Sequence, residues 1–172
     1  RMLARKLNSP VTSSCGRLFD AVAALCGVRD RVNYEGQAAV ELEQALVRDK
    51  VHYEGRITVR DGGAFIIDPF PIVNSVIEDM RRKLPVGRIS ARFHNGIVRL
   101  IAEAARHASA RNGIKTVALS GGVFQNAYLA QRLEGELSDL GFEVFSHSEV
   151  PPNDACISLG QAFIGAGKLT GG

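Results

Sequence analysis

The residues Ser120-Gly121-Gly122 are the strongest candidates in this sequence for holding a ligand. They follow a short apolar run at residues 116–119, which predicts a buried strand covered on both faces. Adjacent glycines permit positive φ and let a ligand approach the backbone, and a helix predicted at residues 124–139 would point its first N–H groups at the same place. The pattern predicts a seat for a phosphate or another anion, and an ordinary strand-to-helix turn is the alternative. It matches neither GxGxxG nor the P-loop.

Three polar side chains could complete such a site. Asn126 falls in the first turn of the predicted helix, where its amide could bond a ribose hydroxyl or a phosphate. Asp154 opens the last predicted helix, as its N-cap or as a ligand group beyond a strand end, where crevices form in α/β proteins. Asp20 lies opposite the apolar stripe of a predicted helix and faces either solvent or a cleft.

Hydrophobic periodicity predicts the elements that position these residues. Helices are expected over residues 12–26, 37–50, 72–84, 89–110, 124–139 and 154–168, with strands at 116–119 and 142–146. Residues 56–60 and 64–67 alternate around Asp61-Gly62-Gly63, which indicates a β-hairpin. The final alternation of strand and helix is typical of a parallel βαβα unit, so the fold class is α/β with more helix than strand. Small residues in the last helix suit close packing on a sheet.

The remaining titratable residues show no spacing that indicates a metal site or a catalytic arrangement. The four histidines are isolated; His94 and His107 share one predicted helix but are too far apart to reach one metal, so all four are predicted to be surface or capping residues. The charged run at residues 78–83 is predicted to be a solvated helix end. Three cysteines without CxxC spacing favour a reducing cytoplasm over a disulfide framework.

Length and composition fit one domain, residues 1–172, with 45% hydrophobic residues to form its core. The 21 lysines and arginines against 18 acidic residues give a net charge of +3, dispersed along the chain, which favours no nucleic-acid or membrane partner. The sequence opens on Arg1 instead of a start methionine, and we expect it to be a piece of a longer protein.

Several stretches together resemble the C-terminal part of the HypF family of carbamoyltransferases, over nearly the whole chain. The matching stretches are SPVTSSCGRLFDA, NYEGQ, ARFHN, LSGGVFQN and VPPND. This part of HypF is related to the TsaD-type tRNA threonylcarbamoyl transferases, so the resemblance implies a lobe of the actin/hexokinase-like (RNase H-like) superfamily. GRLFDA, SGGVFQN and PPND favour HypF over TsaD.

The resemblance implies roles for the candidate residues. Asp20, Gly36, Ser120, Gly121, Gly122 and Asn126 match positions that bind the nucleotide-linked substrate, and Asp154 matches a ligand of a divalent metal, iron or zinc. The other metal ligands in the family are an HxxxH pair, which is expected upstream of this chain. Two differences stand out: Gly36-Gln37 replaces a pair of glycines, and Ala155-Cys156 replaces small residues beside the metal ligand, which predicts a narrower site.

The activity implied by the resemblance is transfer of a carbamoyl group from ATP-derived carbamoyl-adenylate to the C-terminal cysteine of a HypE-type acceptor, in cyanide-ligand synthesis for [NiFe]-hydrogenase. Upstream domains of the same polypeptide would form the adenylate, so no catalytic residue is assigned here and the chain alone is expected to be inactive. The alternatives are a non-catalytic nucleotide-binding or assembly module of the same fold and, less favoured, a sugar-kinase-like relative.

Overall fold

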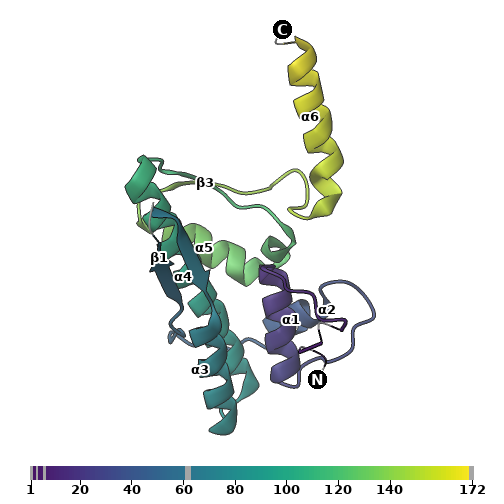
Figure 1. The fold of residues 1–172 in the computed structure, drawn as a ribbon, viewed down its shortest axis with the longest axis vertical. Helices are drawn as coiled ribbons and strands as arrows, with labels where there is room; N and C mark the ends of the chain where they lie inside the picture. Colours follow the sequence, from purple (N-terminus) through teal and green to yellow (C-terminus); the bar gives the residue numbers. More distant parts are fainter. Residues whose placement is uncertain (1, 3, 6, 61–62, 171–172) are drawn as a thin grey trace.

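The computed structural model describes residues 2, 4, 5, 7–60 and 63–170 and shows a mixed α/β chain with two small sheets (Figure 1). The first half contains α1 (Cys15–Leu25), α2 (Gln37–Gln44), β1 (Arg56–Val59), β2 (Phe65–Asp68), α3 (Phe70–Arg81) and α4 (Val86–Asn112). The second half contains β3 (Thr116–Ala118), the 3₁₀ turn η2 (Gly122–Gln125), α5 (Ala127–Asp139), β4 (Glu143–Phe145), the 3₁₀ turn η3 (Asp154–Cys156) and α6 (Ile157–Thr170). The predicted fold class is confirmed.

The long helix α4 organises the core, because α2, α3 and α5 all contact it. Its apolar face meets α1 where the rings of Phe19 and Phe93 pack edge to face, with centroids 4.8 Å apart. Both rings are fully buried. Gly113 ends α4 in the left-handed conformation at φ 71°, which a glycine adopts without steric cost.

A buried ion-pair network ties α4 to α3 and to the segment after α2. Arg92 donates to Asp79 at 2.8 Å and to Asp49 at 3.1 Å, and Tyr53 donates its hydroxyl hydrogen to Asp79 at 2.8 Å. The Val51 N–H and the nearby guanidinium groups lower the pKa of Asp49 to about 2. The prediction of a solvated end for α3 is wrong at Asp79, which is only 6% exposed because these partners enclose it.

The two sheets agree with the predicted pairing. Strands β1 and β2 are antiparallel, with Arg56 opposite Asp68; the turn residues Asp61 and Gly62 lie outside the described residues. Strands β3 and β4 are parallel, as predicted. The prediction that β3 is covered on both faces is wrong, since Thr116 and Ala118 are exposed. A sheet of two strands, contacted by α5, leaves these positions without a covering element among the described residues.

Two helices differ from the predictions at the level of packing. Helix α2 ends at Gln44 instead of near Lys50, because the following residues leave the helix to join the ion-pair network. Helix α6 projects away from the helical body (Figure 1) instead of lying on a sheet, and its apolar side chains, such as Phe163 at 81%, are exposed. Within the described part of the chain, no helix combines the length and apolarity needed to cross a membrane.

Candidate functional site

Two loops meet at the ends of the parallel strands. The glycine loop (Ser120, Gly121 and Gly122) follows β3, and the PPND loop (residues 151–154) follows β4. The Gly121 N–H donates to the Pro152 carbonyl oxygen at 2.8 Å. Gly121 has φ 107°, a conformation that side chains rarely adopt, so this turn requires glycine. Parallel strands place both loops at one sheet edge, where α/β proteins form ligand crevices.

The glycine loop is open to solvent. Ser120, Gly121 and Gly122 are exposed, and a Cβ added at Gly122 would have as its nearest neighbour the Asn153 Cβ, 3.9 Å away. The Ser120 hydroxyl is 3.0 Å from Nε2 of His147, which also lies on the exposed side. The first N–H groups of η2 have no partner within that turn and are available to an anion.

Asp154 is exposed beside the glycine loop, at the start of η3. The alternative that it is the N-cap of the last helix is wrong: Asp154 is the first residue of η3, which precedes α6, and the capping side chain of η3 belongs to Asn153, whose Oδ1 accepts from the Ala155 N–H at 3.1 Å. Among the described residues, no hydrogen bond or ion pair engages the Asp154 carboxylate. Its charge therefore has no evident structural use in this loop.

Asn126 was predicted to lie in the first turn of a helix that starts at the glycines, and this prediction is wrong. The 3₁₀ turn η2 intervenes, because Gly121 turns the chain, and Asn126 becomes the N-cap of α5. Its Oδ1 accepts from the Leu129 N–H at 2.8 Å, and its Nδ2 is 2.9 Å from Nε2 of His94. Asn126 is only 8% exposed, so its amide stabilises the protein interior instead of facing solvent.

The prediction that His94 is a surface or capping residue is wrong, since it is fully buried and lies inside α4, away from both ends of the helix. Its Nδ1 lies 2.7 Å from the Ser90 carbonyl oxygen, which assigns the proton to Nδ1 and leaves Nε2 to accept from Asn126. Burial lowers the pKa of His94 to about 4, against the opposing effect of the Ser90 hydrogen bond. The sequence held a usable signal, because residue 94 precedes Ile97 and Ile101 at the i, i+3, i+7 spacing of a core face.

The other two predicted residues lie on the α1 and α2 side. Asp20 is half-buried on α1, a helix that contacts η2, and it pairs with Arg17 at 3.2 Å. Gly36 is exposed, has φ 80° and precedes α2, which packs on α1. The structure thus brings the glycine loop and Asp154 together and places Asp20 on a neighbouring helix. No hydrogen bond joins Gly36 to this group in the described part of the chain.

The described residues do not form a complete metal site. No group of three or more His, Cys, Asp or Glu side chains among them could hold a metal ion. Asp154 offers one carboxylate, and a full ligand set would need groups beyond the described residues. Burial raises the pKa of the Cys15 and Cys26 thiols to about 11, so both are protonated at neutral pH.

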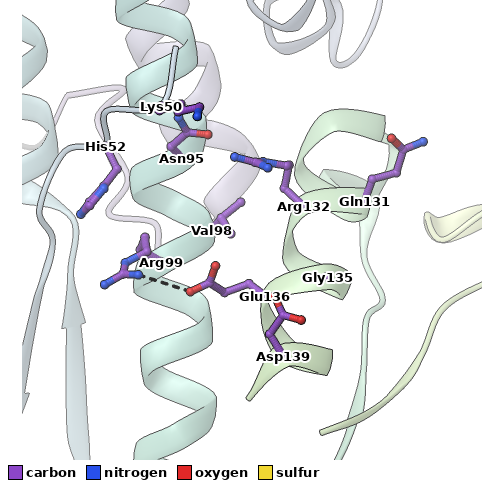
Figure 2. A pocket seen from close by; sticks show the side chains of 10 residues that line it. All are labelled: Lys50, His52, Asn95, Val98, Arg99, Gln131, Arg132, Gly135, Glu136 and Asp139. Carbon is purple, nitrogen blue, oxygen red and sulfur yellow. Dashed lines mark hydrogen bonds and ion pairs between the residues drawn. The ribbon is translucent and has the colours of Figure 1, made fainter. Parts of the chain in front are cut away.

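A hollow of about 320 Å³ lies elsewhere, between α4 and α5 (Figure 2). Arg99 of α4 and Glu136 of α5 form an ion pair of 3.4 Å on its wall. Lys50 and Arg132 add cations, but their side chains are exposed and the lining includes carboxylates as well. None of the predicted site residues lines this hollow, so it is separate from the glycine loop.

Comparisons with known proteins identify relatives of the whole chain. The sequence pattern described as "Carbamoyltransferase, Kae1-like Domain, second subdomain" matches residues 1–161. The HypF carbamoyltransferase of Synechocystis sp. is 36% identical over 94% of this chain, and that of Rhizobium leguminosarum bv. viciae is 40% identical over 93%. A crystal structure of full-length HypF in a phosphate- and nucleotide-bound form matches 99% of this chain at 47% identity with a TM-score of 0.91. The chain spans 20% of each of these two relatives and 22% of the crystallised protein.

Proposed function

This chain belongs to the HypF family of carbamoyltransferases, and on that basis we propose that it is one domain, the C-terminal lobe of the domain that transfers the carbamoyl group. In the intact protein it holds ATP-derived carbamoyl-adenylate while the carbamoyl group moves to the C-terminal cysteine of a HypE-type acceptor. The observation that supports this role best is the meeting of the glycine loop and the PPND loop at one sheet edge.

The glycine loop suits the phosphate of an adenylate. The N–H groups of Gly122 and Val123 begin η2 and can donate to phosphate oxygens, and the absence of a side chain at Gly122 allows close approach. The exposed Ser120 hydroxyl provides a further donor. Asp20 and Gly36, on the neighbouring helices, are proposed to contact the nucleoside part. Asn126 contributes by holding the loop, since its own amide already has two protein partners.

The transfer itself exchanges one bond for another at the carbamoyl carbon. The acceptor thiolate attacks this carbon, a C–S bond forms, and the bond to the adenylate phosphate oxygen breaks, so that AMP leaves with the negative charge. Backbone donors placed at the phosphate stabilise that charge as it develops. If Asp154 binds a divalent metal, iron or zinc, it supplies one oxygen ligand, and the remaining ligands come from other parts of the intact protein, with upstream histidines the proposed source.

The exposed apolar surfaces support the view that other domains of the same polypeptide cover this lobe. Helix α6 exposes Ile157, Leu159, Phe163 and Ile164, and β4 exposes Phe145 at 54%. A continuous apolar helix of this kind is normally packed against another element. We propose that the preceding part of the transfer domain lies against β3, β4 and α6.

Gly122→Ala in the intact protein tests the ligand site. The structure has room for this methyl group and the φ of Gly122 is not positive, so the melting temperature should stay close to that of the wild type. A ligand phosphate at the backbone would meet the methyl group, so AMP binding should weaken by at least tenfold. Protection of residues 119–129 from hydrogen exchange by AMP measures binding at this loop, separately from nucleotide sites in other domains.

Gly135→Ala is the matched control, because this glycine is exposed on α5 with nothing within 4 Å of an added Cβ. It should bind AMP as the wild type does. Unchanged AMP protection in Gly122→Ala would refute the proposed site. AMP protection in a wild-type protein that transfers no carbamoyl group to a HypE-type acceptor would favour the non-catalytic module instead.

A further inference from the structure

A buried chain of hydrogen bonds, called the relay below, connects α4 to the segment that follows the glycine loop. The Ser90 carbonyl oxygen accepts from Nδ1 of His94 at 2.7 Å, and Nε2 of His94 accepts from Nδ2 of Asn126 at 2.9 Å. Asn126 stands at the end of η2, four residues after Gly122. The relay therefore ends at the point where the ligand loop (residues 120–126) enters α5.

His94 decides which way the Asn126 amide faces. An amide has a donor end and an acceptor end, and only one orientation lets Oδ1 accept from Leu129 while Nδ2 donates to an imidazole nitrogen. The imidazole keeps its acceptor toward Asn126 because Ser90 holds the proton on the opposite nitrogen. The rings of Phe19 and Tyr128 pack edge to face on the imidazole, with centroids 5.1 and 5.6 Å from it, and fix its plane.

The ligand loop is anchored at both ends. At its start, the Gly121 N–H donates to Pro152, and at its end Asn126 is held by His94. Glu43 of α2 adds a second hold on α5, since its Oε1 accepts from the Tyr128 N–H at 2.9 Å. Between these anchors the chain makes only the short turn η2, so the direction of its free N–H groups depends on where the anchors lie.

We propose that His94 is a positioning residue for ligand binding at the ligand loop, acting through Asn126. This inference rests on the proposed function, because it assumes that the loop binds the adenylate. His94 itself lies beneath the loop and has no exposed atoms with which to touch a ligand. Its effect is to keep the loop in its binding conformation before the ligand arrives, which spares binding the cost of ordering it.

Two substitutions of His94 in the intact protein separate its hydrogen bond from its packing. His94→Phe keeps an aromatic ring between Phe19 and Tyr128 but removes the acceptor for Asn126. His94→Gln can place Oε1 near the position of Nε2 and keep that acceptor. Because one hydrogen bond contributes modestly, we expect AMP to bind about threefold to tenfold more weakly to His94→Phe. His94→Gln should bind within about threefold of the wild type.

Asn126→Ser provides a second route that does not alter the core histidine. Serine is a good N-cap, so α5 keeps its capped start while the bond to His94 is lost. This variant should weaken AMP binding to the same extent as His94→Phe. Val76→Ala controls for stability, because it creates a cavity at a fully buried position on α3 without altering the relay. All variants are compared by AMP protection of residues 119–129 and by melting temperature.

The outcomes distinguish the two proposals. If Gly122→Ala does not affect AMP protection, the proposed function fails, and the role of His94 fails with it. If Gly122→Ala abolishes protection but Asn126→Ser and His94→Phe bind AMP as the wild type does, only the role of His94 is overturned. It is also overturned if Val76→Ala weakens AMP binding as much as His94→Phe at an equal loss of melting temperature. Weaker binding in His94→Phe and Asn126→Ser, with binding retained in Val76→Ala, supports it.

Discussion

The buried His94 should make the chain less stable in mild acid. Its pKa is 6.5 when freely solvated and about 4 in the folded chain. Between these values the unfolded chain takes up a proton that the folded chain refuses, so the free energy of unfolding falls as the pH falls from 6.5 toward 4. Above pH 6.5 both states are neutral at this residue and the effect vanishes.

The magnitude follows from the two pKa values. Moving from pH 7.5 to pH 5 should remove about 2 kcal/mol of unfolding free energy through His94 alone, and the full shift corresponds to about 3 kcal/mol. For a chain of this size, a loss of about 2 kcal/mol lowers the melting temperature by roughly 4–8 °C. Urea denaturation at a series of pH values measures the slope directly.

His94→Phe supplies the comparison, because phenylalanine cannot take up a proton. The variant is expected to be less stable at every pH, but its stability should fall about 2 kcal/mol less between pH 7.5 and pH 5. His107→Gln is the control, since His107 lies near the other end of α4 and is only half-buried. Its slope measures how removal of another histidine from the same helix affects the pH dependence. Equal slopes for the wild type and His94→Phe would refute the assignment of a neutral, buried His94.

Two further predictions concern the metal ligand and the thiols. Asp154→Asn in the intact protein should keep the wild-type melting temperature, because the cap of η3 is Asn153. Its metal content and its carbamoyl transfer activity should fall, since the negative charge of the ligand is lost. Full transfer activity with full metal content would show that the carboxylate is not a ligand. Cys15 and Cys26 should react with iodoacetamide at pH 8 at least about a hundredfold more slowly than free cysteine, because their raised pKa leaves few thiolates. Peptide mapping measures the rate at each cysteine, and modification of both at the rate of free cysteine would contradict their burial.

Local sequence patterns were sufficient to predict most of the helices and strands. The apolar stripe of α4, its Gly113 stop and the alternation around the hairpin all depend on residues near each other in sequence, so the predicted elements are confirmed there. The strand, helix and strand of the parallel pair are confirmed for the same reason. The boundary of α2 could not be predicted in this way, because Asp49 leaves the helical path to meet arginines about forty residues ahead.

The burial of polar residues could not be predicted from their neighbours in the sequence. Asp79 sits in a charged run that suits a solvated helix end. Arg82 of the same run pairs with it at 3.7 Å, but the hydrogen bonds from the distant Arg92 and Tyr53 are needed to make its burial favourable. The exposure of the apolar side chains of α6 likewise could not be predicted, because it depends on which elements pack against this helix. In the candidate site, the parallel pairing of β3 and β4 was predictable from the alternation of strand and helix. The capping role of Asn153 was not predictable, since Asp154 is an equally good cap by residue type.

Asn126 matches a ligand-binding motif, but both ends of its amide are engaged inside the protein. Asparagine is suited to this position by its two ends, one to cap α5 and one to donate to His94. An aspartate would keep the cap but present an oxygen to the Nε2 lone pair of His94, and a serine would keep the cap without reaching the imidazole. Asparagine can both cap α5 and donate to His94, and these two hydrogen bonds keep its amide away from solvent. In the proposed site the ligand is bound by the backbone of the glycine loop, which needs no side chain to bind an anion.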